Sequence, residues 1–257
     1  MKTKTIGFIG GGRITKIFLQ AFKNKKVVFE NVKVFEPNSE TLSALQNLFP
    51  DIEAVDSAQE AAQQELVVLA VHPPVMAETL AAIKDVVTED TQVLSLAPKV
   101  TIEKIAAALG TSKVIRMIPN ATSFINKGYN PVAFHPETDK RAKKSFMKLF
   151  KALGKNFEVA ENKLEGYAIV SAMLPTYFWF QWEEMLKVAV VTGLDEKEAK
   201  KAVEATLKKS LSIFFKSGLT AEEVKDLIPV KPIVEAEEQI KEIYETKLLG
   251  LYDKIKA

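Results

Sequence analysis

The chain has 257 residues, 47% of them hydrophobic and 26% charged, which is the composition of a globular protein with one large domain or two modest ones. Its 35 basic and 33 acidic residues are interspersed and leave a formal charge of +2, which argues against binding to nucleic acid or to a membrane surface. It has no cysteine, its histidines His72 and His135 lie far apart, and its apolar runs are too short to span a membrane. We therefore expect a cytoplasmic protein with a small-molecule partner and without a metal.

Short apolar runs rich in β-branched residues alternate with amphipathic segments of helix length from Thr5 to about Ala160. This alternation predicts an α/β domain with a buried parallel sheet over residues 1–160. The predicted strands are residues 5–9, 31–36, 65–71, 91–96, 113–118 and 156–160, and the predicted helices are residues 13–22, 39–49, 74–87, 101–110 and 137–154. Ser39 and Thr101, each followed by an acidic residue, mark helix starts, and Gly110 marks a helix end.

The remaining residues, 161–257, carry no strand signal and predict an all-helical domain. The expected helices are residues 162–193, 195–218 and 233–257. The first is apolar on nearly every face through "YFWFQW", which a helix tolerates only when protein surrounds it. We expect two copies of this domain to wrap each other in a homodimer, with Pro175 bending the helix or starting a new one. The alternative is that this helix is the core of a monomeric bundle.

The stretch "GFIGGGRIT", residues 7–15, leaves a predicted strand and enters a predicted helix, which is the context of a dinucleotide-binding loop. Gly10 allows a tight turn, Gly12 lets a pyrophosphate approach the backbone, and the helix N-terminus meets its charge. Thr15 takes the third glycine position and is still small. The pattern therefore favours a Rossmann-like domain, and the alternative is a glycine-rich turn without a ligand.

The cofactor contacts that we expect come from four loops at one end of the sheet. They are Gly10, Gly11, Gly12, Arg13, Ile14, Glu36, Pro37, Asn38, Val71, His72, Pro73 and Ala97. Glu36 stands where an acid binds the adenosine ribose hydroxyls and would repel a 2′-phosphate, so NAD(H) is favoured. Arg13 or Lys16 in reach of a phosphate would permit NADP(H), and a solvated Glu36 is the alternative without a ligand role.

Four segments together resemble the pyrroline-5-carboxylate reductase family: "IGFIGGGRI", "VVLAVHPPVM", "VLSLAPKVTIEKIAAALG" and "VIRMIPNATSFINKGYN". In the helical half, Ser171, Pro175 and Tyr177 resemble the family's Ser-Gly-Ser-Gly-Pro-Ala-Tyr helix. The resemblance implies a Rossmann-like domain followed by an all-α dimerisation domain that intertwines with its copy. It also implies hydride transfer from NAD(P)H to a cyclic imine, a step of proline biosynthesis.

The sequence departs from this family in both loops that are expected to bind the substrate carboxylate. Residues 172–174, "AML", replace Gly-Ser-Gly, and residues 230–233, "VKPI", replace Gly-Gly-Thr-Thr. Proline offers no amide and valine no hydroxyl, so most of the anion-binding groups are lost. Pro98 and Lys99 also stand where the family has small residues.

These departures leave three hypotheses. In the first, the pocket acts on another imine or carbonyl compound, with Ser171, Thr176 and Lys231 as the catalytic candidates. Tyr177 is a further hydroxyl donor and Lys99 a further cation, although a core role for Tyr177 and solvation of the lysines are the simpler interpretations. In the second, the protein binds a dinucleotide without catalysis. In the third, it is another two-domain dehydrogenase, linked to a hydroxyacid or a deazaflavin.

Overall fold

The computed structural model describes residues 4–256, which form two compact units. The first unit comprises the described residues up to Ala172 together with those from Leu251 onward, and the second unit is Met173–Gly250. The helical residues 161–172 thus lie with the sheet, whereas the sequence pattern placed them in the helical domain. The division of the chain into functional domains at residue 160 stays a prediction.

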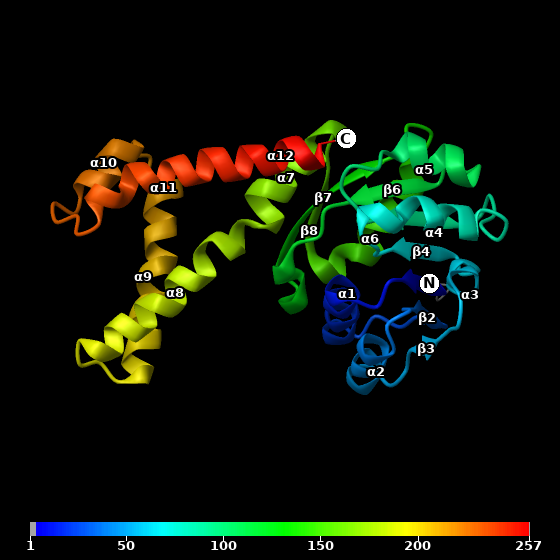
Figure 1. Ribbon diagram of the computed structural model, residues 1–257, viewed down its shortest axis with the longest axis horizontal. Coiled ribbons are helices and arrows are strands. Elements are labelled where there is room, and N and C mark those ends of the chain that lie inside the picture. Colours follow the sequence, from blue (N-terminus) through cyan, green and yellow to red (C-terminus); the bar gives the residue numbers. More distant parts are fainter. Residues whose placement is uncertain (1–3, 257) are drawn as a thin grey trace. The chain divides into compact units, whose positions relative to one another are not determined.

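The first unit contains one eight-stranded sheet with the order β3-β2-β1-β4-β5-β6-β7-β8 (Figure 1). Its strands are β1 (Ile6–Ile9), β2 (Val32–Phe35), β3 (Glu53–Ala54), β4 (Leu66–Leu69), β5 (Gln92–Ser95), β6 (Val114–Met117), β7 (Gly128–Phe134) and β8 (Gly154–Glu158). Strands β1 to β6 pair in parallel, and the strand order reverses direction between β1 and β4. The predicted fold class, a Rossmann-like sheet followed by helices, is confirmed.

Strand β7 is the exception, because it runs antiparallel to β6 and parallel to β8. The connection from β6 to β7 contains only a short 3₁₀ helix, η2 (Ala121–Ile125). A parallel partner needs a longer crossover, usually through an α-helix. The expectation of an all-parallel sheet is therefore corrected at this edge.

Two groups of helices cover the two faces of the sheet (Figure 1). The helices of this unit are α1 (Arg13–Asn24), α2 (Ser39–Leu48), α3 (Ala58–Ala62), α4 (Met76–Ile83), α5 (Ile102–Leu109), α6 (Lys140–Phe150) and α7 (Leu164–Tyr167). Helices α3, α4 and α5 contact one another in sequence, and α1 meets α6 through the edge-to-face rings of Phe18 and Phe150, 6.0 Å apart. Every residue of β1 and β4 between these layers is buried, which explains their unbroken apolar sequences.

Helix boundaries follow the local signals in the sequence. Thr101 precedes α5, and its hydroxyl accepts the Lys104 N–H at 3.2 Å, while Gly110 ends the same helix in a left-handed conformation with φ 67°. Ser39 is the first residue of α2, although the capping side chain is that of Asn38. The predicted starts and the predicted end are thereby confirmed. The sequence patterns predicted neither strand β7 nor the short elements β3, α3 and η2.

The regular secondary structure of the second unit is all helical in its described residues. It contains α8 (Leu174–Val191), α9 (Glu196–Lys216), α10 (Ala221–Asp226), η6 (Val234–Ala236), α11 (Glu237–Ile243) and the π-helix η7 (Tyr244–Leu248), which leads into α12 (Leu249–Ile255). Pro175 is in the first turn of α8, so of its two expected roles, bending a helix or starting a new one, the structure shows the second. The π-helix η5 (Ala168–Ala172) precedes it and belongs to the first unit.

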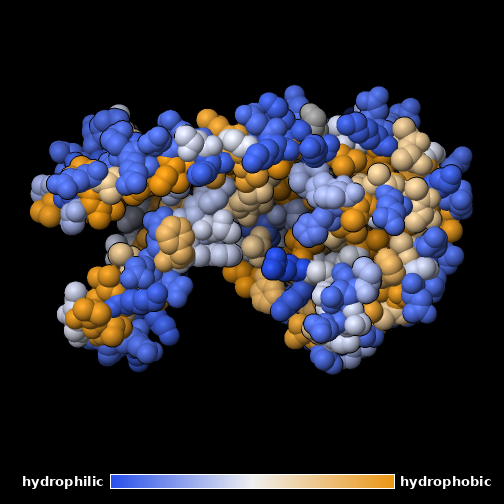
Figure 2. Space-filling view, viewed as in Figure 1, coloured by the Kyte–Doolittle hydropathy of each residue, from blue (hydrophilic) through white to orange (hydrophobic). Residues whose placement is uncertain are grey.

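Helix α8 is apolar, yet it is not buried within the second unit. Among described residues 173–250, Ala199 alone is buried, at 1% exposure. Figure 2 shows hydrophobic side chains on the surface of this unit, including the turn between α8 and α9, where Val191 is 87% exposed. In the part of the chain that the structure describes, no helix is long and apolar enough to cross a membrane.

Candidate dinucleotide-binding and active site

The loop between β1 and α1 makes a turn that only glycine adopts readily at its first position. Gly10 has φ 104°, and a Cβ on it would lie 2.5 Å from the carbonyl oxygen of Ala70. The buried hydroxyl of Thr15 donates to the Gly10 carbonyl at 2.5 Å. Thr15 therefore does more than substitute for the third glycine of the pattern, because it ties the first turn of α1 back to the loop.

The N-terminus of α1 offers backbone amides to open space. Gly12 is the residue before the helix, and within the described residues no side chain caps it and no acid lies in the first turn. A Cβ on Gly12 would meet nothing within 4 Å. Arg13, at the first helical position, is exposed. This end of the helix carries a positive partial charge without a protein partner, so it fits the pyrophosphate of a dinucleotide.

The carboxylate of Glu36, after β2, is fixed beside this loop. Its Oε2 accepts the Gly11 N–H at 2.8 Å, and its Oε1 accepts the Asn38 N–H at 3.0 Å. Each carboxylate oxygen keeps a further lone pair with which to accept a ribose hydroxyl. Asn38 was predicted to contact the cofactor. In the structure its side-chain oxygen accepts the Thr41 N–H at 2.8 Å and caps α2. Pro37 between them is exposed.

The other predicted cofactor residues follow β4 and β5. Val71 and Pro73 are partly buried, whereas His72 is exposed and precedes the 3₁₀ helix η1 (Pro73–Val75). Ala97 is buried after β5. Strands β2, β1, β4 and β5 are neighbours and parallel, so their carboxyl ends share one edge of the sheet. The structure thus places all the predicted cofactor residues along this edge, and their binding role stays a prediction.

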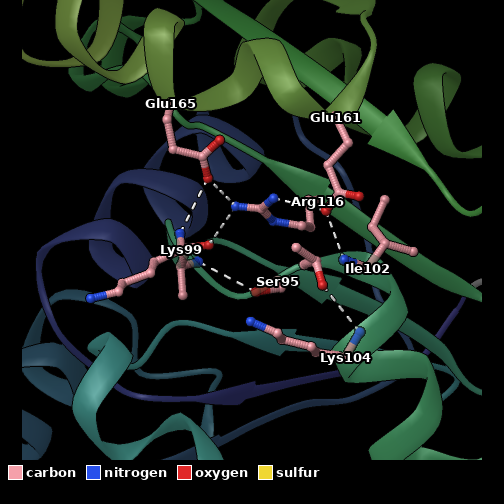
Figure 3. A network of polar contacts seen from close by, with 9 residues as sticks. Ser95, Lys99, Ile102, Lys104, Arg116, Glu161 and Glu165 are labelled. Atoms are coloured by element: carbon pink, nitrogen blue, oxygen red, sulfur yellow. Dashed lines mark hydrogen bonds and ion pairs between the residues drawn. The ribbon is translucent and has the colours of Figure 1, made fainter. Parts of the chain in front are cut away.

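A buried arginine lies at the same edge, and sequence reasoning assigned it no role. Arg116, in β6, has a side chain 1% exposed that donates from Nη1 to Glu161 Oε1 at 2.8 Å and from Nη2 to Glu165 Oε1 at 2.5 Å (Figure 3). A charged residue inside the apolar strand "VIRMI" was the available signal, because such a residue needs a partner when buried. The partners lie 45 and 49 residues further along the chain, where no local pattern indicates them.

The same three side chains hold the loop between β5 and α5. Arg116 Nη2 also donates to the Ala97 carbonyl at 3.3 Å, and Glu165 Oε1 accepts the Lys99 N–H at 3.2 Å. Glu161 Oε1 accepts the Ile102 N–H at 2.7 Å. The backbone from residue 97 to residue 102 is therefore anchored at three points by one buried ion-pair network (Figure 3).

Ser171, one of the catalytic candidates, is held by a second network in the first unit. Asn120 Nδ2 donates to the Ser171 carbonyl at 3.0 Å and to its Oγ at 3.3 Å, and the Ser171 hydroxyl donates to the Tyr129 carbonyl at 3.3 Å. Asn120 is itself oriented by its N–H bond to Asn130 Oδ1 at 2.8 Å. The hydroxyl of Ser171 is thus fixed in position, and Asn120 is a second residue at the site to which sequence reasoning assigned no role.

Thr176 and Lys231, the other two catalytic candidates, belong to the second unit. The Thr176 hydroxyl donates to the Met173 carbonyl at 2.7 Å in the first turn of α8. Lys231 is exposed in the loop after α10 and lines a cavity of about 500 Å³. Burial, and then the neighbouring Tyr244, raise the pKa of Tyr177, so its phenol stays protonated at neutral pH. The catalytic roles of these residues stay predictions.

A doubly wound sheet with a glycine loop at the reversal of strand order is the arrangement of a Rossmann-type dinucleotide-binding domain. The sequence model of a family described as NADP oxidoreductase coenzyme F420-dependent matches residues 5–99. Pyrroline-5-carboxylate reductase from Escherichia coli is 29% identical over 228 residues, which are 88% of this chain and 84% of that protein. The chain is thus similar to pyrroline-5-carboxylate reductases over most of its length.

Solved structures agree on the fold. The pyrroline carboxylate reductase of Plasmodium falciparum, crystallised with NADP, superposes with a TM-score of 0.79 at 20% identity, over 99% of this chain and 96% of that one. The pyrroline-5-carboxylate reductase of Coxiella burnetii gives a TM-score of 0.68 at 24% identity, over 99% and 95% of the two chains. The similarity therefore extends beyond the dinucleotide-binding half through the helical residues.

Proposed function

We propose that this protein is an NAD(P)H-dependent reductase that transfers hydride to the C=N bond of a cyclic imine or of a related C=N or C=O compound. The observation that carries the proposal is the uncapped N-terminus of α1, with open space at Gly12 and the ordered Glu36 beside it. The relatives named pyrroline-5-carboxylate reductase support the imine as substrate class.

The reaction makes few demands on acid or base side chains. A bound reduced nicotinamide supplies the hydride, and a protonated imine is already an electrophile. The work of this chain is to align the two reactants and to exclude water. Ser171, Thr176 and Lys231 are the proposed substrate contacts, and among them Ser171 has the most fixed hydroxyl, through Asn120.

We propose NAD(H) as the preferred cofactor. The Glu36 carboxylate is held by two backbone N–H groups at the place where the adenosine ribose binds, and it would repel a 2′-phosphate. The exposed Arg13 at the start of α1 keeps NADP(H) as the alternative. We further propose a homodimer through the helical second unit, and action in the cytoplasm.

Gly12→Ala tests the cofactor site. Gly12 has φ −74°, and a Cβ would meet open space, so the folded protein should tolerate alanine without a change in melting temperature. The added methyl group would occupy the place where a pyrophosphate approaches the backbone, so the Kd for NADH should rise by about tenfold or more. Calorimetric titration with NADH and thermal unfolding measure the two effects.

Gly166→Ala is the matched control, because its added Cβ also meets nothing within 4 Å and lies in α7, away from the loop. This variant should bind NADH as the unaltered protein does. Unchanged NADH binding by Gly12→Ala would show that the α1 terminus is not the pyrophosphate site.

A turnover assay distinguishes the proposed reductase from the second candidate, a protein that binds a dinucleotide without catalysis. The second candidate is favoured by the larger Met173 and Leu174, which replace small residues of the reductase family. NADH oxidation should be assayed with pyrroline-5-carboxylate and with a panel of cyclic imines and ketones. We expect turnover of at least one imine, and NADH binding without turnover of any compound would support the inactive protein instead.

A further inference from the structure

The backbone of Lys99 has a conformation that disfavours a side chain. Its φ is 73°, and in the described part of the chain only Lys26 and Asn126 are other non-glycine residues with positive φ. Asparagine tolerates this region, and Lys26 lies in the turn that follows α1. Lys99 instead lies directly at the carboxyl edge of the sheet, where backbone strain often accompanies function.

The backbone of Lys99 is hydrogen-bonded to the buried ion-pair network. Glu165 Oε1 accepts the Lys99 N–H at 3.2 Å, and the same oxygen receives Arg116 Nη2 at 2.5 Å. The Glu165 side chain is only 3% exposed, so this acceptor is held rigidly. The network therefore fixes where the Lys99 side chain leaves the backbone.

The side chain itself takes no part in the network. Figure 3 shows the Lys99 ammonium directed away from Arg116, and the residue is exposed. Its Nζ forms no ion pair with any residue that the structure describes. A cation is thus presented on a fixed backbone and is available to an external anion.

The position of Lys99 in the sheet order specifies which end of the cofactor it faces. Glu36 follows β2, the glycine loop follows β1, and Lys99 follows β5 on the far side of β4. A dinucleotide with its adenosine ribose at Glu36 and its pyrophosphate at Gly12 crosses the strand-order reversal and directs its nicotinamide toward β4 and β5. Lys99 is therefore on the nicotinamide side of the edge.

We propose that Lys99 binds an anionic group of the substrate, a carboxylate on the imine ring, and thereby determines substrate specificity. This inference rests on the proposed reductase function. The Lys99 ammonium takes the place of the anion-binding groups that are lost at residues 172–174 and 230–233. The Glu165–Arg116 pair positions this lysine through its backbone N–H. Selection for the cation explains why a lysine occupies a position whose φ favours glycine.

Four variants test the proposal: Lys99→Met, Lys99→Arg, Lys99→Gly and, as the matched control, Lys104→Met. Lys104 is an exposed lysine in the first turn of α5, so its removal makes the same charge change nearby. In Lys99→Met the KM for pyrroline-5-carboxylate should rise by about tenfold or more, while the KM for 1-pyrroline, which lacks the carboxylate, should not change. Lys99→Arg should retain most of the affinity, and Lys104→Met should resemble the unaltered enzyme.

Stability gives an independent readout. Lys99→Gly relieves the left-handed strain, so its melting temperature should rise by about 2–4 °C while its KM for the carboxylate substrate rises as in Lys99→Met. A solvated lysine without function would show the gain in stability and no change in KM. An equal KM change for charged and uncharged imines, or an unchanged KM in Lys99→Met, would overturn the proposal.

Binding of L-proline to the NADH-loaded protein keeps this test separate from the reductase assignment. If no imine is reduced but proline binds and Lys99→Met weakens that binding, the reductase function fails and the role of Lys99 stands. If the unaltered protein reduces imines with equal affinity whether or not they carry a carboxylate, the reductase function stands and the role of Lys99 is wrong. Failure to bind proline and to reduce any imine or ketone would overturn both.

Discussion

At the scale of a single residue, we propose two roles for Glu36. Its two carboxylate oxygens accept the N–H groups of Gly11 and Asn38, so it orders the glycine loop before any ligand binds. A Cβ placed on Gly11 would lie 2.9 Å from the Glu36 Cβ, which shows how closely the two backbones approach. The same carboxylate brings negative charge to the expected position of the adenosine ribose.

We therefore expect Glu36→Ser to improve NADPH binding relative to NADH binding by about tenfold, a difference of about 1.4 kcal/mol. The serine removes the charge that repels a 2′-phosphate. Because it also removes two acceptors from the loop, the absolute affinity for NADH should fall. Calorimetric Kd values for the two cofactors provide the measurement.

Glu36→Gln is the companion variant, since it keeps an acceptor of similar size and removes only the charge. It should shift the ratio in the same direction with less loss of NADH binding. An unchanged ratio of NADPH to NADH affinity in both variants would show that Glu36 does not select the cofactor.

At the scale of elements, helix α6 illustrates how a local cap responds to pH. Asp139 precedes this helix, and its Oδ1 accepts the N–H groups of Arg141 at 2.7 Å and Ala142 at 2.9 Å. The hydrogen bond from Ala142, followed by that from Arg141, lowers the pKa of the Asp139 carboxyl below its ordinary value of 3.8. The ionised form is therefore the one that the folded state favours.

The sign of the pH dependence follows from this lowered pKa. The stabilisation is fully present above the pKa of the unfolded chain and is lost as the pH falls through the lower pKa of the folded state. Asp139→Asn keeps a capping acceptor but cannot ionise. Its melting temperature should lie below that of the unaltered protein at neutral pH, and the gap should close as the pH falls through the lowered pKa of Asp139 in the folded state.

Thermal unfolding of both proteins as a function of pH checks this expectation. A gap of constant size over the whole pH range would mean that shape, and not charge, accounts for the contribution of Asp139 to the cap.

At the scale of the whole molecule, the second unit lacks a core of its own. Large apolar side chains on its helices are exposed, and Ala199 alone among described residues 173–250 is buried. The most exposed aromatic residues are Phe180 on α8, at 65%, and Phe215 on α9, at 72%. Apolar surface of this extent indicates an interface, and a second copy of the same helices is the occupant that we propose.

The expected result in sedimentation is a dimer or an assembly of dimers. Phe215→Asp should shift the protein toward monomer or unfold it, since a charge would be buried in the interface. Val28→Asp is the matched control, because Val28 is equally exposed, at 72%, in the first unit. A monomeric unaltered protein, or equal effects of the two substitutions, would contradict the proposed dimer.

Local sequence rules predicted much of the first unit. Buried strands such as β4 are unbroken apolar runs, and helix ends such as Gly110 carry residue types that suit one conformation. The loops that hold the cofactor residues follow from the same alternation. Element bounds were less well predicted: the strand expected at 156–160 is β8 at Gly154–Glu158, because strand ends depend on the partner strand β7.

The amino-acid sequence by itself determined the α/β order of the elements, the glycine turn at Gly10 and the position of Glu36 after β2, because each depends on residues close together in the chain. Only the tertiary structure decided that Arg116 pairs with Glu165 and that this pair holds the backbone of Lys99. Such contacts join residues tens of positions apart and leave no periodicity in the sequence. A charged residue in an apolar strand indicates that a partner of opposite charge is needed, but only the fold determines which residue that partner is.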